Sequence, residues 1–200
     1  MGKPVIGIVG GIGSGKSFVA AEFARRGGRL ISADPLGHDA LRQPHLRDRV
    51  VERWGRKVLD ATGDVDRRAL GRIVFPDPKE LRALEAITYP YIEQRVAEEI
   101  AKAEADPAVR FVILDAAVML EAGWSNRCDH IVFIDAPREV RLARLIQTRG
   151  WTEAELARRE ANQMPLDEKR RHADGLIQNG GDGEGIRSQV ERLLRQWKVL

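Results

Sequence analysis

Short apolar runs alternate with longer segments of helical periodicity along this chain of 200 residues. The runs lie at residues 5–9, 29–32, 111–114, 131–134 and 176–178. Continuous apolar runs of this kind are typical of strands buried on both faces, as in a parallel sheet. Because helical segments separate the runs, the pattern predicts an α/β fold with a five-stranded parallel sheet flanked by helices.

The spacing between the predicted strands is uneven. Residues 35–108 lie between the second and third strands, and one crossover helix needs far fewer. We therefore expect a helical, substrate-binding insertion at about 35–108. Within it, a long helix is expected to begin at Pro90, because Ile92, Val96 and Ile100 repeat at four-residue spacing.

A second helical segment, about 138–172, separates the last two predicted strands. Its pattern predicts a helix, a turn at Gly150, a second helix and a break at Pro165. The segment is rich in arginine and poor in large apolar residues, so we interpret it as a mobile lid. A solvated helical hairpin with ordinary surface charge is the alternative. The rest, about 1–34, 109–137 and 173–200, forms the core of a single predicted domain.

Residues 10–17 match the phosphate-binding pattern G-x-x-x-x-G-K-[ST]. Its glycines let backbone N–H groups turn toward a polyphosphate, Lys16 places a positive charge beside the β- and γ-phosphates, and the Ser17 hydroxyl suits Mg²⁺. The motif follows the first predicted strand and precedes a helical pattern, which is the context it requires. The sequence therefore predicts a nucleotide-binding loop. No G-x-G-x-x-G pattern fits here, which disfavours a dinucleotide-binding fold.

Acidic residues follow three of the predicted strands: Asp34 the second, Asp115 the third and Asp135 the fourth. In an open parallel sheet, ligands bind beyond the carboxyl ends of the strands, where the phosphate loop also lies. These three carboxylates are therefore candidate site residues.

Asp34 is the candidate catalytic carboxylate, which would orient an attacking hydroxyl and accept its proton. A helix cap is the alternative, since Asp34-Pro35 also suits an N-cap followed by proline at the first helical position. Asp115 resembles the acidic residue that assists Mg²⁺ in P-loop proteins; its alternative is a strand-end carboxylate bonded to a loop. Asp135 fits a turn or a helix start better than a site.

Two lid arginines are candidates for the chemistry of phosphoryl transfer, which needs positive charge on the equatorial oxygens of the transferred group. Arg144 and Arg159 are placed where a closing lid would supply it, and ordinary surface arginines are the alternative reading. The histidines form no metal-ligand spacing, and the one cysteine has no histidine cluster around it.

The charge balance argues against nucleic acid as a partner. The chain has 33 Lys and Arg against 30 acidic residues, and the two kinds are interleaved rather than clustered. The single cysteine excludes a disulfide framework and fits a reducing compartment. No apolar run is long enough to span a membrane and no signal peptide is recognised, so we expect a cytoplasmic protein, monomeric or weakly homo-oligomeric.

Taken together, motifs along the whole chain resemble the dephospho-CoA kinase family, which phosphorylates the 3′-hydroxyl of dephospho-coenzyme A. The P-loop alone is shared with many unrelated proteins, whereas the combination is much narrower. Ser32-Ala33-Asp34 stands where the family usually has D-A-D. The other similar stretches are 9–17, 63–75 and 163–169, together with Asp174 and Asn179-Gly180.

The resemblance implies a P-loop kinase fold and the conversion of ATP and dephospho-CoA to ADP and CoA with Mg²⁺, the last step of coenzyme A biosynthesis. It implies catalytic roles for Lys16, Asp34, Arg144 and Arg159. It also makes Arg67 a candidate for binding the acceptor, dephospho-CoA. Metal contacts are implied for Ser17 and Asp115. Nucleotide contacts are implied for Gly11, Ile12, Gly13, Ser14, Gly15, Lys16, Ser17, Phe18 and Asn179.

The chain departs from the family pattern at three places. Tyr89-Pro90 stands where the family commonly has H-P, and residues 117–121 replace a P-L-L-[FV]-E motif. The family's lid arginine near Gly150 falls on Thr148, with Arg149 one step later. These changes leave the P-loop and Asp34 intact, but they weaken any carried-over role for Tyr89 or Arg149.

Three other functions fit parts of the sequence. A kinase that acts on a nucleotide or a shikimate-like acceptor would share the core and differ in the insertion. A GTPase is disfavoured, because the D-x-x-G match at 60–63 follows no predicted strand and N-K-x-D is absent. An ATP-dependent nucleic-acid-binding module would need basic residues clustered with aromatic ones, and they are not.

Overall fold

The computed structural model describes residues 2–181 and 185–199. The chain divides into two compact units, Met1–Ser32 with Glu99–Leu200, and Ala33–Glu98. One boundary between them falls inside a long helix, α5 (Pro78–Ala105). Within the described ranges, no helix is both long and apolar enough to cross a membrane.

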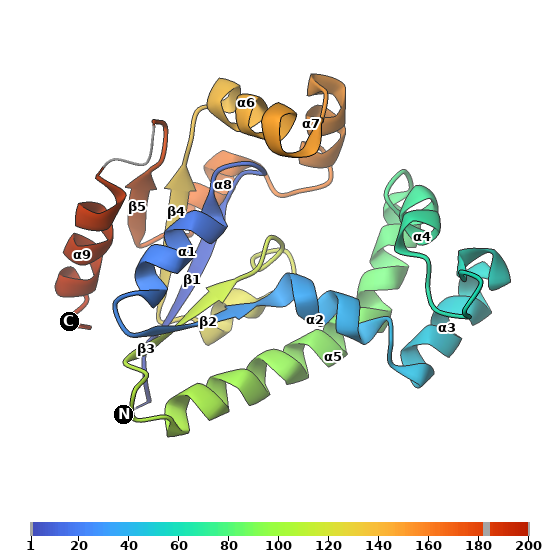
Figure 1. Ribbon diagram of the computed structural model, residues 1–200, viewed down its shortest axis with the longest axis horizontal. Coiled ribbons are helices and arrows are strands. Elements are labelled where there is room, and N and C mark those ends of the chain that lie inside the picture. The colour runs from blue at the N-terminus through green and yellow to red at the C-terminus, as the bar shows by residue number, and fades with distance from the viewer. Residues whose placement is uncertain (1, 182–184, 200) are drawn as a thin grey trace. The chain divides into compact units, whose positions relative to one another are not determined.

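Five parallel strands form the sheet of the first unit (Figure 1). They are β1 (Val5–Gly10), β2 (Gly28–Ser32), β3 (Phe111–Asp115), β4 (His130–Asp135) and β5 (Gly175–Gln178). The order is β2-β3-β1-β4-β5, and every pair of neighbours is parallel. The predicted five-stranded parallel sheet is confirmed, and its central strands are buried as their continuous apolar runs require.

The strand order places a topological switch point beside β1. This strand pairs with β3 on one side and β4 on the other, with Ile8 opposite Asp115 and Gly10 opposite Ile134. The chain therefore leaves β3 and β4 on opposite sides of the P-loop, which follows β1. In open α/β sheets such a divergence forms the crevice that binds ligands.

Two helices, α1 (Lys16–Ala24) and α9 (Ile186–Gln196), pack with one face of the sheet to form the main core. Ile6 and Ile8 belong to that core, whereas Gly7 between them faces Met119 and Cys128 on the other side, as the two-residue period of a strand requires. Phe23 of α1 packs edge-on against Phe111 at a centroid distance of 6.4 Å. Helix α1 is thereby fixed with its first turn at the P-loop.

The predicted lid segment, about 138–172, contains α6 (Arg138–Arg149), α7 (Glu153–Glu160) and α8 (Leu166–Arg171). Gly150 ends α6 in a left-handed conformation with φ 64°, so the predicted turn at this glycine is confirmed. The Thr152 side chain accepts a hydrogen bond from the Glu155 N–H and caps α7. A short 3₁₀ helix, η2 (Trp124–Arg127), precedes β4.

The second unit is helical in the part of the chain that the structure describes. It contains α2 (Ala33–Ala40), α3 (Pro44–Trp54), the 3₁₀ helix η1 (Arg56–Val58), α4 (Arg67–Val74) and the first part of α5. The indole N–H of Trp54 donates to Glu80 at 2.7 Å, and Arg53 forms an ion pair with the same carboxylate, which joins α3 to α5. Buried apolar residues of this unit include Leu46, Val50, Leu70, Val74 and Ile87.

The prediction that a helix begins at Pro90 is wrong, because α5 begins at Pro78 and Pro90 lies inside it. The Asp77 side chain accepts a hydrogen bond from the Lys79 N–H at 2.8 Å, which supports the true start. Proline removes one backbone donor from the helix. Ile87, Ile92 and Val96 are buried on either side of it, so packing holds the helix together across the missing hydrogen bond.

Candidate active site

The P-loop joins β1 to α1, and two of its glycines are required by its geometry. Gly13 has φ 78° and Gly15 has φ 85°, a left-handed conformation that side chains rarely adopt. A Cβ on Gly13 would also lie 2.8 Å from the Arg141 carbonyl oxygen, and one on Gly15 would lie 2.3 Å from Asn179 Nδ2. The loop therefore needs glycine at both places to adopt this conformation and to contact its neighbours.

Lys16 and Ser14 have the properties expected of a phosphate cradle. The Lys16 ammonium donates to the carbonyls of Gly10 and Gly11 at 3.2 and 3.3 Å, which holds the cation over the loop. Ser14 Oγ is buried and has no hydrogen-bond partner among the described residues. A buried hydroxyl without a partner is costly, and a bound phosphate would supply one.

Ser17 and Asp115 lie together at the carboxyl end of the sheet. Ser17 is in the first turn of α1, Asp115 ends β3 beside β1, and Ser17 Oγ donates to Asp115 Oδ2 at 3.4 Å. Hydroxyl and carboxylate oxygens are ligands that suit Mg²⁺, which usually takes few protein ligands and completes its shell with phosphate and water. Among the described residues, no group of three or more His, Cys, Asp and Glu side chains could hold a metal ion.

Asn179 and Arg144 hold the outer side of the P-loop. Asn179 is buried at the end of β5 and donates through Nδ2 to the Ser14 carbonyl at 2.7 Å. Arg144 of α6 donates to Asn179 Oδ1 at 3.3 Å and to the Gly181 carbonyl at 2.9 Å. It also approaches the Ser14 carbonyl at 3.4 Å. The structure thus brings these two predicted residues together with the loop.

Arg159 lies on α7, on the surface of the lid itself. Its Nε donates to Glu155 at 2.8 Å, and its guanidinium lies 4.4 Å from the centre of the Trp151 ring. Arg149 approaches the same ring at 5.3 Å. Such cation–π contacts stabilise a guanidinium, so Trp151 interacts with two arginines of this segment, a contact that the sequence did not indicate.

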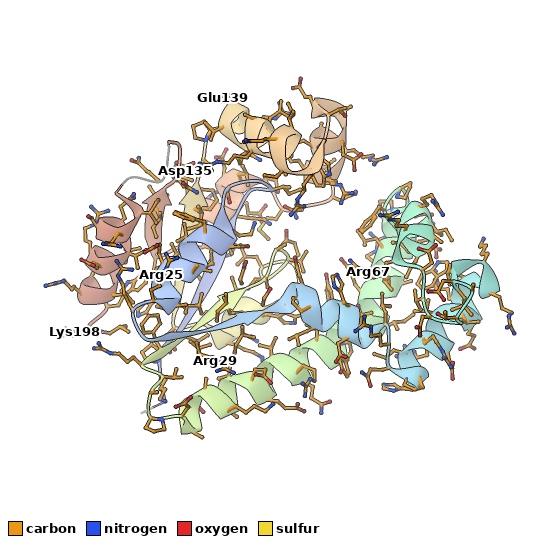
Figure 2. The ribbon with its side chains drawn as sticks, viewed as in Figure 1. Arg25, Arg29, Arg67, Asp135, Glu139 and Lys198 are labelled. Atoms are coloured by element: carbon orange, nitrogen blue, oxygen red, sulfur yellow. The ribbon has the colours of Figure 1, made fainter. Side chains whose placement is uncertain are left out.

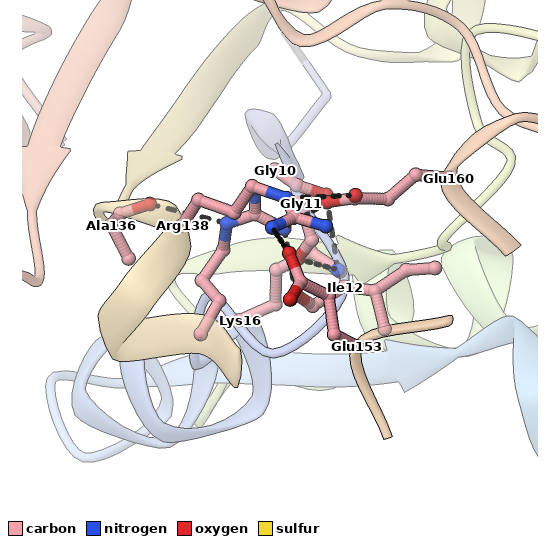
Figure 3. Close-up of polar contacts among 9 residues, drawn as sticks. Gly10, Gly11, Ile12, Lys16, Ala136, Arg138, Glu153 and Glu160 are labelled. Atoms are coloured by element: carbon pink, nitrogen blue, oxygen red, sulfur yellow. Dashed lines mark hydrogen bonds and ion pairs between the residues drawn. The ribbon is translucent and has the colours of Figure 1, made fainter. Parts of the chain in front are cut away.

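The sequence analysis also missed Arg141, which lies beneath the P-loop and is only 3% exposed. It donates from Nε to the Ala136 carbonyl at 3.2 Å, and from Nη1 to the Ile12 carbonyl at 3.1 Å and to Glu160 at 2.6 Å. Figure 3 labels these three partners, Ala136, Ile12 and Glu160. Arg141 lies one helical turn before Arg144 on the same face of α6, and this spacing could have identified it from the sequence.

Asp34 is described within the second unit, where it lies in the first turn of α2 and is exposed. The helix begins at Ala33, so Asp34 is not the residue before the helix that the cap alternative required. Its carboxylate favours the protonated form of His38, one turn along α2. Loss of hydration and the nearby charge of Arg67 act in the opposite direction and lower the pKa of His38 overall. His38 therefore senses the charges of both Asp34 in α2 and Arg67 in α4; Figure 2 labels Arg67.

Three other residues from the sequence analysis have clear places. Asp135 ends β4 and approaches Arg170 at 3.6 Å, and α6 begins three residues later, which agrees with a turn before a helix (Figure 2). Phe18 is about half exposed in the first turn of α1. The Tyr89 hydroxyl donates to Glu85 in its own helix at 2.8 Å.

An ion pair joins residues 117–121, which follow β3, to α8 at the end of the predicted lid segment. Lys169 of α8 is only 1% exposed, and its ammonium lies 2.8 Å from Glu121 and 3.2 Å from the Ala117 carbonyl. Glu121 also accepts a hydrogen bond from the Met164 N–H at 3.0 Å. The loop after β3 and the end of the lid are thereby fixed to each other.

Comparisons with known proteins identify the family of the chain. The family model for dephospho-CoA kinase matches residues 4–184. A dephospho-CoA kinase of Geobacter metallireducens is 41% identical over 197 residues, which cover 97% of this chain and 95% of the relative. One of Carboxydothermus hydrogenoformans is 34% identical over 196 residues, which cover 98% and 95%.

Solved structures agree in fold. A protein of Thermus thermophilus superposes with a TM-score of 0.84 at 33% identity and with 98% of each chain covered. Dephospho-CoA kinase of Campylobacter jejuni gives a TM-score of 0.70 at 23% identity with 96% of each chain covered. Shikimate kinase of Acinetobacter baumannii shares the fold more distantly, with a TM-score of 0.53 and coverage of 98% of this chain and 93% of that one. With a P-loop kinase fold and a family match over nearly its whole length, the chain belongs to the dephospho-CoA kinase family.

Proposed function

We propose that this protein transfers the γ-phosphoryl group of ATP to the ribose 3′-hydroxyl of dephospho-CoA, giving ADP and CoA, with Mg²⁺ and in the cytoplasm. The observation that carries the phosphoryl-transfer chemistry is the P-loop with Lys16 over it and the Ser17–Asp115 pair at its end. The identity of the acceptor is supported by the family match. A substrate of this size suits the large helical second unit, which we propose binds the acceptor.

The proposed nucleotide contacts lie in the P-loop and its surroundings. Backbone N–H groups of residues 11–18 and the Lys16 ammonium hold the phosphates, with Asn179 supporting the loop and Phe18 near the nucleotide. Ser17 and Asp115 hold Mg²⁺, directly or through water, and the ion would supply charge neutralisation on the phosphates. Binding at a helix N-terminus adds a further preference for anions.

The proposed transfer step moves one phosphoryl group between two oxygens. The bond between the γ-phosphorus and the bridging oxygen of ATP breaks, and a bond forms between that phosphorus and the 3′-oxygen of the ribose. Asp34 orients the hydroxyl and takes its proton. Arg144 and Arg159 offset the negative charge on the transferred group, and the lid excludes water, which would otherwise compete as the acceptor.

Release of ADP from ATP and Mg²⁺ tests the proposal, with dephospho-CoA measured beside AMP, CMP, adenosine and shikimate. We expect release with dephospho-CoA alone, and a loss of about tenfold to a thousandfold in kcat/KM in Lys16→Ala from the removal of one preorganised charge. The exposed Lys57→Ala is the matched control. Turnover with another acceptor but not with dephospho-CoA would keep the kinase chemistry and refute the proposed substrate.

A further inference from the structure

Arg141 is a buried charged residue of the first unit, and the proposed chemistry does not use it. A guanidinium that is 3% exposed needs compensation for its lost hydration. It has three acceptors: the carbonyls of Ala136 and Ile12, and the Glu160 carboxylate. Because Glu160 neutralises its charge at 2.6 Å, Arg141 is suited to hold protein groups in place rather than to bind a phosphate itself.

Its contact with Ile12 bears directly on the orientation of the P-loop. The Ile12 carbonyl and the Gly13 N–H belong to one planar trans peptide group, in which C=O and N–H point in opposite directions. A donor that holds the carbonyl toward α6 therefore directs the Gly13 N–H away from α6. A residue larger than glycine at position 11 would approach the guanidinium to 2.9 Å, so the loop lies closely on Arg141.

Its contact with Glu160 reaches the lid. Glu160 is the last residue of α7 and follows Arg159 directly. A second pair of contacts joins the same two helices, since Arg138 of α6 meets Glu153 at 2.6 Å and Glu160 at 3.5 Å (Figure 3). Arg141 also contacts the P-loop, through the Ile12 carbonyl.

We infer that Arg141 is a positioning residue that links the Ile12–Gly13 peptide of the P-loop to Glu160 of the lid. Through this link, α7 and the adjacent Arg159 keep a fixed place relative to the loop that holds the phosphates. The inference rests on the proposed role of Arg159 in the transfer step. It assigns Arg141 an effect on turnover without any contact to substrate.

Glu160→Gln tests the link with little risk to folding, because the Glu160 side chain is 27% exposed. Glu153→Gln is the matched control, because it removes the same charge from the same helix and also breaks an ion pair to α6. Its partner is Arg138, whereas Glu160 pairs with Arg141, which contacts the P-loop. We expect Glu160→Gln to lower kcat about tenfold through misplacement of Arg159, with KM for ATP within about threefold of the parent value. Glu153→Gln should change kcat less than about twofold.

Together with Glu160→Gln, the variants Arg141→Gln and Arg141→Gln/Glu160→Gln form a double-mutant cycle. Residues that act as one unit give non-additive losses, so the double variant should lose no more kcat than the worse single variant. Arg141→Lys keeps the charge but not the fork of donors, and it should recover only part of kcat. Equal behaviour of Glu160→Gln and Glu153→Gln, or additive losses in the double variant, would overturn the inference.

Arg159→Ala separates this inference from the proposed function. A loss of turnover in Arg159→Ala without one in Glu160→Gln would overturn the link alone. Full turnover in Arg159→Ala would refute the role of Arg159 and, with it, the inferred effect of Arg141 on catalysis. Loss in both, with parent-like behaviour of Glu153→Gln, is the expected result.

Discussion

At the scale of single residues, Asp34 carries the proposed chemistry of the acceptor. Its exposed carboxylate lies one helical turn before His38 in α2 and favours the protonated form of that imidazole. Asp34→Asn keeps the shape of the side chain and removes the proton acceptor, so we expect kcat to fall about a hundredfold or more. The Kd for ATP should stay at the parent value, because the proposed nucleotide contacts all lie in the first unit.

The matched control for this prediction is Asp48→Asn, which removes an exposed carboxylate from α3 of the same unit. Its kcat should stay within about twofold of the parent value. Steady-state turnover and calorimetric ATP binding measure the two quantities separately. A parent-like kcat in Asp34→Asn would remove Asp34 from the mechanism.

His38 reports on the charges of Asp34 and Arg67 through its titration. Its pKa lies below the ordinary value of 6.5 because of lost hydration and the nearby charge of Arg67, which outweigh the opposing effect of Asp34. The folded protein thus binds this proton more weakly than the unfolded chain does, so His38 makes the protein less stable as the pH falls below about 6.5. Titration by NMR should show a midpoint below that value.

Two substitutions should move the titration midpoint of His38 in opposite directions. Asp34→Asn removes the charge that favours the protonated imidazole, so it should lower the midpoint of His38 further. Arg67→Ala should raise it. A His38 midpoint that neither substitution changes would contradict the electrostatic effects of Asp34 and Arg67 on this imidazole.

At the scale of elements, the Glu121–Lys169 pair joins the loop after β3 to α8. Removing one member of a buried ion pair leaves the other without compensation. Because Lys169 is 1% exposed, Glu121→Gln should lower the free energy of unfolding by about 3 kcal/mol. Urea unfolding measures this quantity.

Glu153→Gln provides the comparison, since its pair with Arg138 is exposed and should contribute less than about 1 kcal/mol. Replacing both partners of the buried pair, as Glu121→Leu with Lys169→Met, should recover much of the loss. An equal loss in the free energy of unfolding in Glu121→Gln and Glu153→Gln would show that the buried pair contributes no more stability than the exposed one.

The elements also show where sequence patterns succeed and fail. The strands were predictable because buried parallel strands are continuous apolar runs, and the turn at Gly150 because glycine favours the left-handed conformation found there. The start of α5 was not, since local propensity places a break at Pro90 whereas buried residues on both sides keep the helix continuous. Packing decided that boundary, and packing is not visible in a single window of sequence.

At the scale of the whole molecule, the P-loop motif and the alternation of strands with helical segments predicted the fold, and the place of nucleotide binding stays a prediction. The link from Arg141 to both Ile12 and Glu160 was not predictable, because it joins residues 129 and 19 positions apart in the chain. The role of Trp151 as a surface for Arg149 and Arg159 was missed for a similar reason. A motif indicates which residues contact a ligand, whereas the residues that hold them in place follow from the folded chain.

The measurement that tests the account most directly is the structure of the product formed from ATP and dephospho-CoA. The account predicts a gain of one phosphate by mass, and ³¹P and ¹H NMR should place it on the ribose 3′-oxygen, identical to authentic CoA. A phosphate at another position, or ATP hydrolysis that leaves dephospho-CoA unchanged, would contradict it.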